Sequence, residues 1–120
     1  MLSKGWFGLI KDRAFLKHIL DEIEYLTTTS QSVELNGVIN DPHLQRSFIR
    51  SLEVIGEATK NLSKDLKNNH PEIEWRKIAG MRDKLIHYYF GVDWDVVWDV
   101  VKNKLPAFKR QIKGLLDEFE

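Results

Sequence analysis

The sequence predicts an all-α fold, an up-and-down bundle of four to five helices formed by a single domain over residues 1–120, with its core at about residues 11–116. Three observations support this prediction. Apolar side chains recur every three or four residues over several long segments, which is the period of an amphipathic helix. Glycine is sparse, and two of the three prolines fall at expected helix boundaries. Hydrophobic residues make up 42% of the chain, which is enough for a packed core.

The first helix is predicted over about residues 11–26, where Phe15, Leu16, Ile19 and Ile23 keep the helical spacing. The polar run of residues 27–30 then breaks the apolar pattern. Residues 31–40 that follow fit either a loop or a short helical turn.

The second helix is expected to begin at Asn40 or Asp41, because either side chain can cap a helix whose first turn contains Pro42. Its apolar positions continue to about Leu66. Gly56 lies in the middle of this segment, and its missing side chain would let another helix approach closely.

The third helix is predicted over about residues 73–88, with Gly91 at its exit. The fourth helix begins at Asp93, which is a good N-cap residue. Pro106 falls inside this last helical pattern. Because the apolar spacing continues beyond it, we expect a kink there rather than the end of the helix.

The charge and composition of the chain exclude several classes of function. The sequence has 18 basic and 18 acidic residues, so any contact with RNA must come from a local cluster or an assembled oligomer. The absence of cysteine excludes disulfides, thiolate metal sites and cysteine nucleophiles. No histidine pair shares helical spacing with a carboxylate, so neither a metal site nor a cofactor is predicted. No apolar run is long enough for a membrane span, and no signal peptide is recognised, so we expect a cytoplasmic location and no membrane partner.

Arg82 is the most unusual residue of the predicted third helix. At about 100° per residue, it falls in the middle of an apolar stripe that includes Trp75, Leu85 and Tyr89. A guanidinium on such a face must pair with a carboxylate, bind an anion or lie at an interface. Pairing with Glu57 on the second helix and binding of a phosphate group are both open at this point.

His87 lies about 140° around the same ideal helix from Arg82. It follows Asp83 by four residues, so the carboxylate could hydrogen-bond the imidazole, although an ordinary surface histidine fits equally well. Arginine and histidine together suit phosphodiester chemistry without a metal, because one binds phosphate and the other transfers protons near neutral pH. One imidazole cannot easily take and give a proton at once, and a symmetric dimer would supply a second.

The segment from Arg82 to Tyr89, Arg-Asp-Lys-Leu-Ile-His-Tyr-Tyr, resembles the R-x4-6-H motif of HEPN domains and the fuller R-x4-H-x-Y motif of the HepT toxins. The resemblance covers about residues 11–116. It extends to further stretches in the order expected for that family, namely Ile55–Ala58, His70–Trp75, Ile78–Asp83, Tyr89–Asp93 and Val97-Trp98.

The resemblance implies a HEPN-like helical bundle that dimerises and acts as a metal-independent endoribonuclease, the toxin of a type VII-like toxin–antitoxin system. The implied partners are an RNA substrate such as tRNA or mRNA, and a minimal nucleotidyltransferase antitoxin in a larger heteromeric complex; no DNA partner is expected. It assigns Arg82 to phosphate and transition-state binding and His87 to acid–base catalysis. Asp83 would orient or polarise the site. Tyr89 would be the residue to which the antitoxin transfers AMP, and the added anion would oppose RNA binding.

Two other functions are compatible with the sequence. The chain could be a non-catalytic partner or substrate-binding subunit of a nucleotidyltransferase, in which Arg82 is structural. It could also be a generic helical interaction domain. RNA cleavage by the wild-type chain, and its loss when Arg82 or His87 is replaced in a folded protein, would separate catalysis from both.

Overall fold

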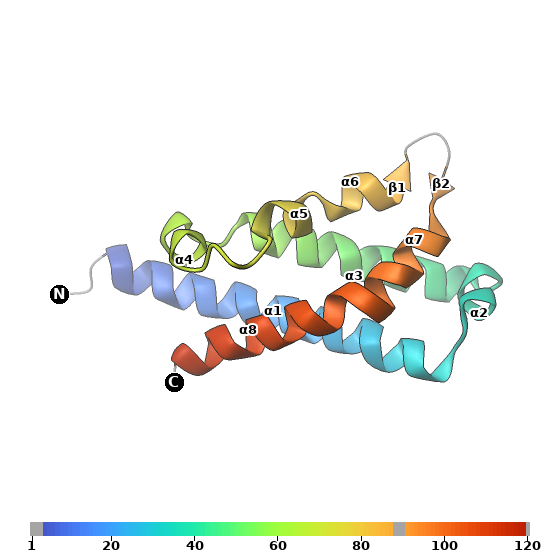
Figure 1. Cartoon of the computed structure of the whole chain (residues 1–120), viewed down its shortest axis with the longest axis horizontal. Coiled ribbons are helices and arrows are strands. Elements are labelled where there is room, and N and C mark those ends of the chain that lie inside the picture. Colours follow the sequence, from blue (N-terminus) through green and yellow to red (C-terminus); the bar gives the residue numbers. More distant parts are fainter. Residues whose placement is uncertain (1–3, 88–90, 120) are drawn as a thin grey trace.

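The computed structural model describes residues 4–87 and 91–119, with the backbone alone for residues 4–6 and 87. These residues form an elongated body of 54 × 30 × 24 Å that is helical apart from one short hairpin (Figure 1). In chain order the elements are α1 (Lys4–Ser32), α2 (Leu35–Ile39), α3 (Pro42–Lys60), α4 (Lys64–Asn69), α5 (Trp75–Ala79), α6 (Met81–Leu85), β1 (Ile86–His87), β2 (Gly91–Val92), α7 (Trp94–Asp99), the π-helix η1 (Val100–Lys104) and α8 (Leu105–Glu118).

The long elements alternate in direction. Helix α1 runs antiparallel to α3 and to the continuous rod of α7, η1 and α8, while α5 and α6 run back along α3 (Figure 1). The predicted all-α class is confirmed for the described residues. The predicted third helix differs from the prediction, since it consists of the short helices α5 and α6 instead of one long helix. None of the described helices is both long and apolar enough to cross a membrane.

Helix α1 continues to Ser32, six residues beyond its predicted end. Within this helical polar run, hydroxyl groups donate to carbonyls of the preceding turn, so they are satisfied without a break in the helix. Thr27 Oγ1 donates to the carbonyl of Ile23 at 2.9 Å, and Ser30 Oγ donates to that of Thr27 at 3.0 Å. The ambiguous segment that follows contains the short helix α2.

The predicted start of α3 is confirmed. Asp41 lies at the N-cap, and its Oδ1 accepts hydrogen bonds from the backbone N–H groups of His43 at 2.9 Å and Leu44 at 3.2 Å. Pro42 takes the first helical turn, where its missing N–H costs nothing.

The predicted end of α3 at Leu66 is wrong, because the helix ends at Lys60 and Ser63 caps a new helix, α4. A long-range contact fixes this break. Asp12 of α1, only 3% exposed, accepts a hydrogen bond from the Ser63 backbone N–H at 2.8 Å and another from its hydroxyl at 2.6 Å. The hydroxyl oxygen in turn accepts from the N–H of Leu66 at 3.1 Å.

The predicted third helix is also wrong as a single rod. It divides at Gly80 into α5 and α6, and Ile86 and His87 are extended where the prediction had helix; Tyr88, its predicted end, lies outside the described residues. Ile86 is β-branched, and β-branched residues favour extended backbone. Strands β1 and β2 pair antiparallel, with Ile86 opposite Val92 and His87 opposite Gly91. Gly91 has a φ of 84°, which a glycine adopts without strain.

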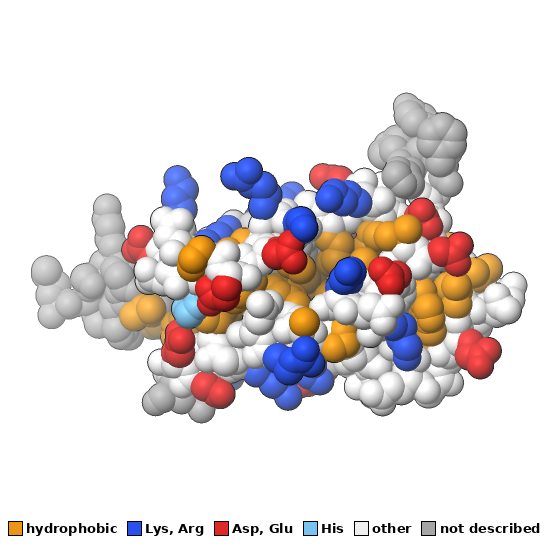
Figure 2. Space-filling view, viewed as in Figure 1, with side chains coloured by type: hydrophobic (Ala, Val, Ile, Leu, Met, Phe, Trp, Pro, Cys, Tyr) orange, Lys and Arg blue, Asp and Glu red, His pale blue; other side chains and the backbone are white. Residues whose placement is uncertain are grey.

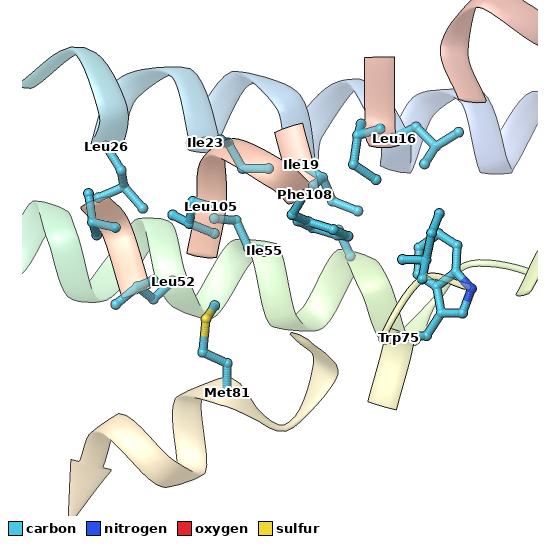
Figure 3. Packing of buried hydrophobic residues seen from close by; sticks show 14 of the residues in the cluster. Leu16, Ile19, Ile23, Leu26, Leu52, Ile55, Trp75, Met81, Leu105 and Phe108 are labelled. Atoms are coloured by element: carbon cyan, nitrogen blue, oxygen red, sulfur yellow. The ribbon is translucent and has the colours of Figure 1, made fainter. Parts of the chain in front are cut away.

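One hydrophobic cluster joins the helices. Side chains from α1, α3 and α8 fill its centre, and residues of α5 and α6 close its side (Figure 3). Full burial of each Leu or Ile side chain contributes roughly 1.5–3 kcal/mol. The close approach expected at Gly56 is confirmed, since a Cβ atom there would lie 3.3 Å from the carbonyl oxygen of Ala79. The contact sets α5 directly against α3. The residues of the hydrophobic cluster that Figure 3 labels are Leu16, Ile19, Ile23, Leu26, Leu52, Ile55, Trp75, Met81, Leu105 and Phe108.

The rod formed by α7, η1 and α8 passes through Pro106 without ending, as predicted. A proline has no N–H to donate to the preceding turn, and the backbone before it widens into the π-helix η1. Within η1, Lys102 donates from Nζ to the carbonyl of Ser30 at 3.0 Å, near the C-terminal end of α1. The ammonium group also lies 5.5 Å from the ring centroid of Trp98.

Candidate active site

Arg82 lies on the outside of α6. Met81 and Leu85 point into the core with 6% and 1% exposure, whereas the Arg82 side chain is 47% exposed. The prediction that Arg82 occupies an apolar stripe is therefore wrong. It assumed one continuous helix, and the break at Gly80 resets which residues of α6 face the core.

The carboxylate that pairs with Arg82 is Glu53 of α3. Arg82 Nε donates to Glu53 Oε2 at 3.1 Å, and Nη1 lies 3.7 Å from Asp83 Oδ1. The predicted partner, Glu57, lies one turn further along α3 and is exposed, so that pairing is corrected to Glu53. A pair this open to solvent contributes only about 0–1 kcal/mol to folding.

The guanidinium of Arg82 keeps most of its donors available. An arginine has five N–H donors, and among the described residues only the Nε–H of Arg82 has a hydrogen-bond acceptor. Glu53 thus holds the group at Nε, and Nη1 lies beside Asp83 on a side chain that is 47% exposed. This is a suitable arrangement for binding a phosphate at the surface.

His87 follows directly from the end of α6. Its backbone lies in β1 opposite Gly91, and the N–H of Asp93 donates to the carbonyl of Leu85 at 2.9 Å, which closes the base of the hairpin. Because α6 ends at Leu85, the helical angle of about 140° between Arg82 and His87 does not apply. The His87 side chain and the whole of Tyr89 lie outside the described residues, so their predicted roles stay predictions.

The structure therefore brings together Arg82, Asp83 and Glu53, with the start of β1 immediately beyond them. Glu53 was missed from the sequence, although it lies one turn from Glu57 on the same face of α3. Within the part of the chain that the structure describes, no three His, Asp or Glu side chains gather closely enough to hold a metal ion.

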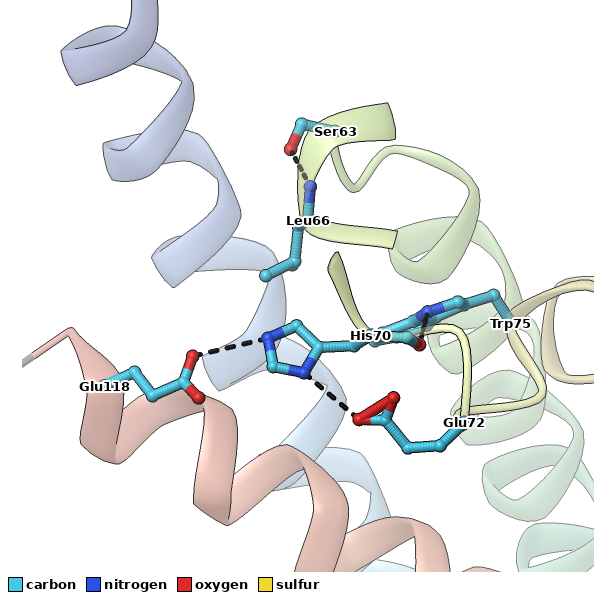
Figure 4. A network of polar contacts seen from close by, with 6 residues as sticks. All are labelled: Ser63, Leu66, His70, Glu72, Trp75 and Glu118. Atoms are coloured by element: carbon cyan, nitrogen blue, oxygen red, sulfur yellow. Dashed lines mark hydrogen bonds and ion pairs between the residues drawn. The ribbon is translucent and has the colours of Figure 1, made fainter. Parts of the chain in front are cut away.

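A second polar cluster, which the sequence did not indicate, surrounds His70 at the opposite end of the bundle (Figure 4). His70 Nδ1 lies 3.2 Å from Glu72, and Nε2 lies 3.4 Å from Glu118 near the end of α8. Its carbonyl accepts a hydrogen bond from Trp75 Nε1 at 3.0 Å. The cluster therefore joins the loop before α5 to α8.

The chain matches a known protein family. A family model described as "Ribonuclease HepT-like" matches residues 17–115, which include every described residue of the Arg82 site. The chain belongs to this family. The HEPN-type resemblance noted in the sequence is thereby confirmed at the level of the HepT-like ribonucleases.

Individual relatives cover nearly the whole chain. A protein of Caldanaerobacter subterraneus named as a candidate RNase is 43% identical over 88% of this chain and 95% of its own length. One from Methanocaldococcus jannaschii, also named as a candidate RNase, is 40% identical over 90% of this chain and 89% of its own. A protein of Thermococcus cleftensis named as a candidate ribonuclease HepT is 44% identical over 84% of this chain and 92% of its own. No solved structure matches the chain significantly.

Proposed function

We propose that the chain is a metal-independent endoribonuclease that cleaves RNA through attack by a ribose 2′-hydroxyl. The observation that carries the proposal is an exposed Arg82, anchored by Glu53, on the helix that leads directly into His87, in a chain of the HepT-like ribonuclease family. The contact with Glu53 uses one N–H donor of the guanidinium, and the other donors remain for a phosphate.

In the proposed reaction, the 2′-oxygen attacks the adjacent phosphorus and its proton passes to the imidazole of His87. The P–O5′ bond breaks, and the leaving 5′-oxygen receives a proton from a second acid, for which a symmetric dimer offers His87 of the partner subunit. The products are a 2′,3′-cyclic phosphate and a 5′-hydroxyl. Arg82 stabilises the negative charge that builds up on the non-bridging phosphate oxygens.

The proposal includes a role as a cytoplasmic toxin that is neutralised by a minimal nucleotidyltransferase. Tyr89 follows His87 by two residues, so AMP attached to its hydroxyl would place a bulky anion next to the proposed proton-transfer group. Intact mass of the chain produced together with a minimal nucleotidyltransferase of the proposed antitoxin type tests this part. An increase in AMP-sized steps on the peptide that contains Tyr89 is expected; an unmodified chain in a stable complex would indicate inhibition by binding alone.

The catalytic proposal is tested by replacing Arg82 and His87 with alanine, separately and together. Each change should lower the rate of RNA cleavage, measured in the presence of EDTA, by at least about 100-fold. Matched controls are Arg110→Ala on α8 and His18→Ala on α1, which remove exposed residues of the same types. Thermal melting followed by circular dichroism checks folding. A folded double variant that still cleaves RNA, or cleavage that stops with EDTA, contradicts the proposal.

The ion pair between Arg82 and Glu53 favours one second candidate, a non-catalytic subunit that binds a nucleotidyltransferase. In that case Arg82 would serve only to fix α6 on α3. The alanine variants would then lose stability or partner binding, and the wild-type chain would leave RNA intact.

A further inference from the structure

An open groove of about 680 Å³ runs along the loop before α5, α5 itself and the start of α6. Its floor is apolar and includes Ile73 and Trp75. Its rim is cationic. Figure 2 shows basic side chains gathered over α4, α5 and α6, along the upper edge of that view. The basic residues that line the groove are Lys67, Arg76, Lys77 and Lys84.

The groove carries a positive charge that the whole chain lacks. Glu74 is its one acidic lining residue, and it pairs with Lys77 at 2.6 Å. The hydrogen bond from Lys77 lowers the pKa of Glu74, and its charge together with the more distant charge of Lys104 acts in the same direction. Arg76 and Lys84 have no acidic partner among the described residues, so their charges are open to a ligand.

Lys67 adds a cation that is partly withdrawn from water. Burial lowers its pKa, although the charge of Asp12 opposes that shift. Its ammonium group donates to the carbonyl of Lys60 at 3.2 Å, which holds it at the α4 end of the groove. A cation with incomplete hydration gains more from a phosphate than a fully hydrated one does.

An apolar floor with a cationic rim matches the chemistry of a single RNA strand. The rim can follow the phosphates, and the floor can take sugar and base faces, which are apolar and similar among sequences. The groove also adjoins the candidate site, because Lys84 lies on the same short helix as Arg82. Residues two apart on a helix point to different sides, so a strand reaching both must cross the outer side of α6.

We propose that this groove binds the single-stranded RNA segment that flanks the cleaved phosphate, an inference that rests on the proposed ribonuclease function. The RNA footprint then extends from Arg82 across α6 and along α5 towards Lys67. Substrates too short to leave the Arg82 site gain nothing from the groove, whereas longer ones gain several phosphate contacts.

The test compares two double charge reversals with the same change in net charge. Arg76→Glu with Lys84→Glu alters the groove; Lys17→Glu with Lys113→Glu alters exposed lysines on α1 and α8 outside it. Affinity for a labelled single-stranded RNA of about 20 nucleotides is measured by fluorescence anisotropy at several salt concentrations, in an inactive Arg82→Ala/His87→Ala background. Cleavage of the same RNA and of a dinucleotide is measured in the active background.

The groove variant should lose at least about tenfold in RNA affinity, and the slope of log K against log salt should fall by roughly 1.4, which corresponds to two phosphate contacts on a single strand. The control variant should stay within about twofold of its parent. The groove variant should also cleave the long RNA more slowly while cleaving the dinucleotide at the parent rate.

Equal losses in both charge-reversal variants, or unchanged RNA affinity in the groove variant, would overturn the groove proposal. Unchanged RNA affinity with lost binding to polyglutamate would reassign the groove to an acidic protein partner. The two proposals fail separately. RNA binding that depends on the groove in a chain without cleavage activity contradicts the catalytic proposal alone, whereas cleavage that ignores the groove contradicts this inference alone.

Discussion

The polar and charged side chains at the two ends of the bundle differ in burial and in hydrogen bonding. At the end that carries both termini, Asp12 is buried and accepts two hydrogen bonds from Ser63, one on each carboxylate oxygen, and both ring nitrogens of His70 face carboxylates (Figure 4). At the hairpin end, Arg82 is half-exposed and uses a single N–H donor on Glu53. At the first end the polar groups hold segments of the chain together, whereas at the second end most N–H donors of Arg82 have no acceptor among the described residues.

This difference indicates that the charge of Asp12 serves mainly stability, whereas the charge of Arg82 serves mainly function. A buried carboxylate without its hydrogen bonds costs several kcal/mol, so the contact between Asp12 and Ser63 is expected to stabilise the break between α3 and α4. An exposed ion pair contributes little to folding, so we assign Arg82 a role in what its remaining donors can bind. The comparison predicts that substitutions at the termini end change stability and those at the hairpin end change activity.

The largest stability effect is expected for Asp12→Ala. It leaves the backbone N–H and the hydroxyl of Ser63 without their acceptor in a partly buried setting, which should lower the free energy of unfolding by about 2–4 kcal/mol. Urea denaturation measures this change. The cleavage rate per folded molecule should stay at the wild-type value.

The control for Asp12 is Asp21→Ala, which removes an exposed aspartate from the same helix. It should change stability by less than about 0.5 kcal/mol. If Asp12→Ala melts like this control, the buried contact does not hold α4 in place. If it abolishes cleavage in folded protein, the separation of the two ends is wrong.

The sequence was sufficient where the signal is local. Asp41 before Pro42 and Asp93 before α7 are caps whose acceptors and donors lie within three residues, and both cap as predicted. The continuation of the helix through Pro106 was also predicted from a local signal, namely the apolar spacing on both sides of the proline.

The sequence was insufficient where a distant contact decides. Ser63 caps the new helix with its own hydroxyl, but Asp12, 51 residues earlier, also holds its backbone N–H, and periodicity contains no trace of that pairing. The break at Gly80 was also missed, and it changes the candidate site. Once α6 starts anew, the residues that face the core shift, Arg82 moves outward, and its partner becomes Glu53 instead of Glu57.

A smaller effect, in activity instead of stability, is expected for Glu53→Ala. Arg82 keeps its charge but loses the contact that orients it, so kcat should fall by roughly tenfold while KM stays nearly constant. The free energy of unfolding should change by no more than about 1 kcal/mol. Glu53→Gln retains an acceptor and should recover most of the lost kcat.

Glu57→Ala is the matched control for Glu53, since it removes the exposed glutamate one turn away on α3. It should cleave RNA at the wild-type rate. Equal losses in the two variants would mean that the general negative charge of α3 matters and the specific contact with Arg82 does not.

The smallest effect is expected for His70→Asn. Its two carboxylate partners are mostly exposed, with Glu118 at 59%, so the lost contacts should cost about 0.5 kcal/mol, measured by urea denaturation against His18→Asn on the surface of α1. A double-mutant cycle with Glu118→Gln isolates the pair. If the coupling is this small, the buried Leu115 and Phe108 hold α8 in place, and the charges add only local order. A coupling of several kcal/mol would instead make His70 as structural as Asp12, and α8 would then be held by charge more than by packing.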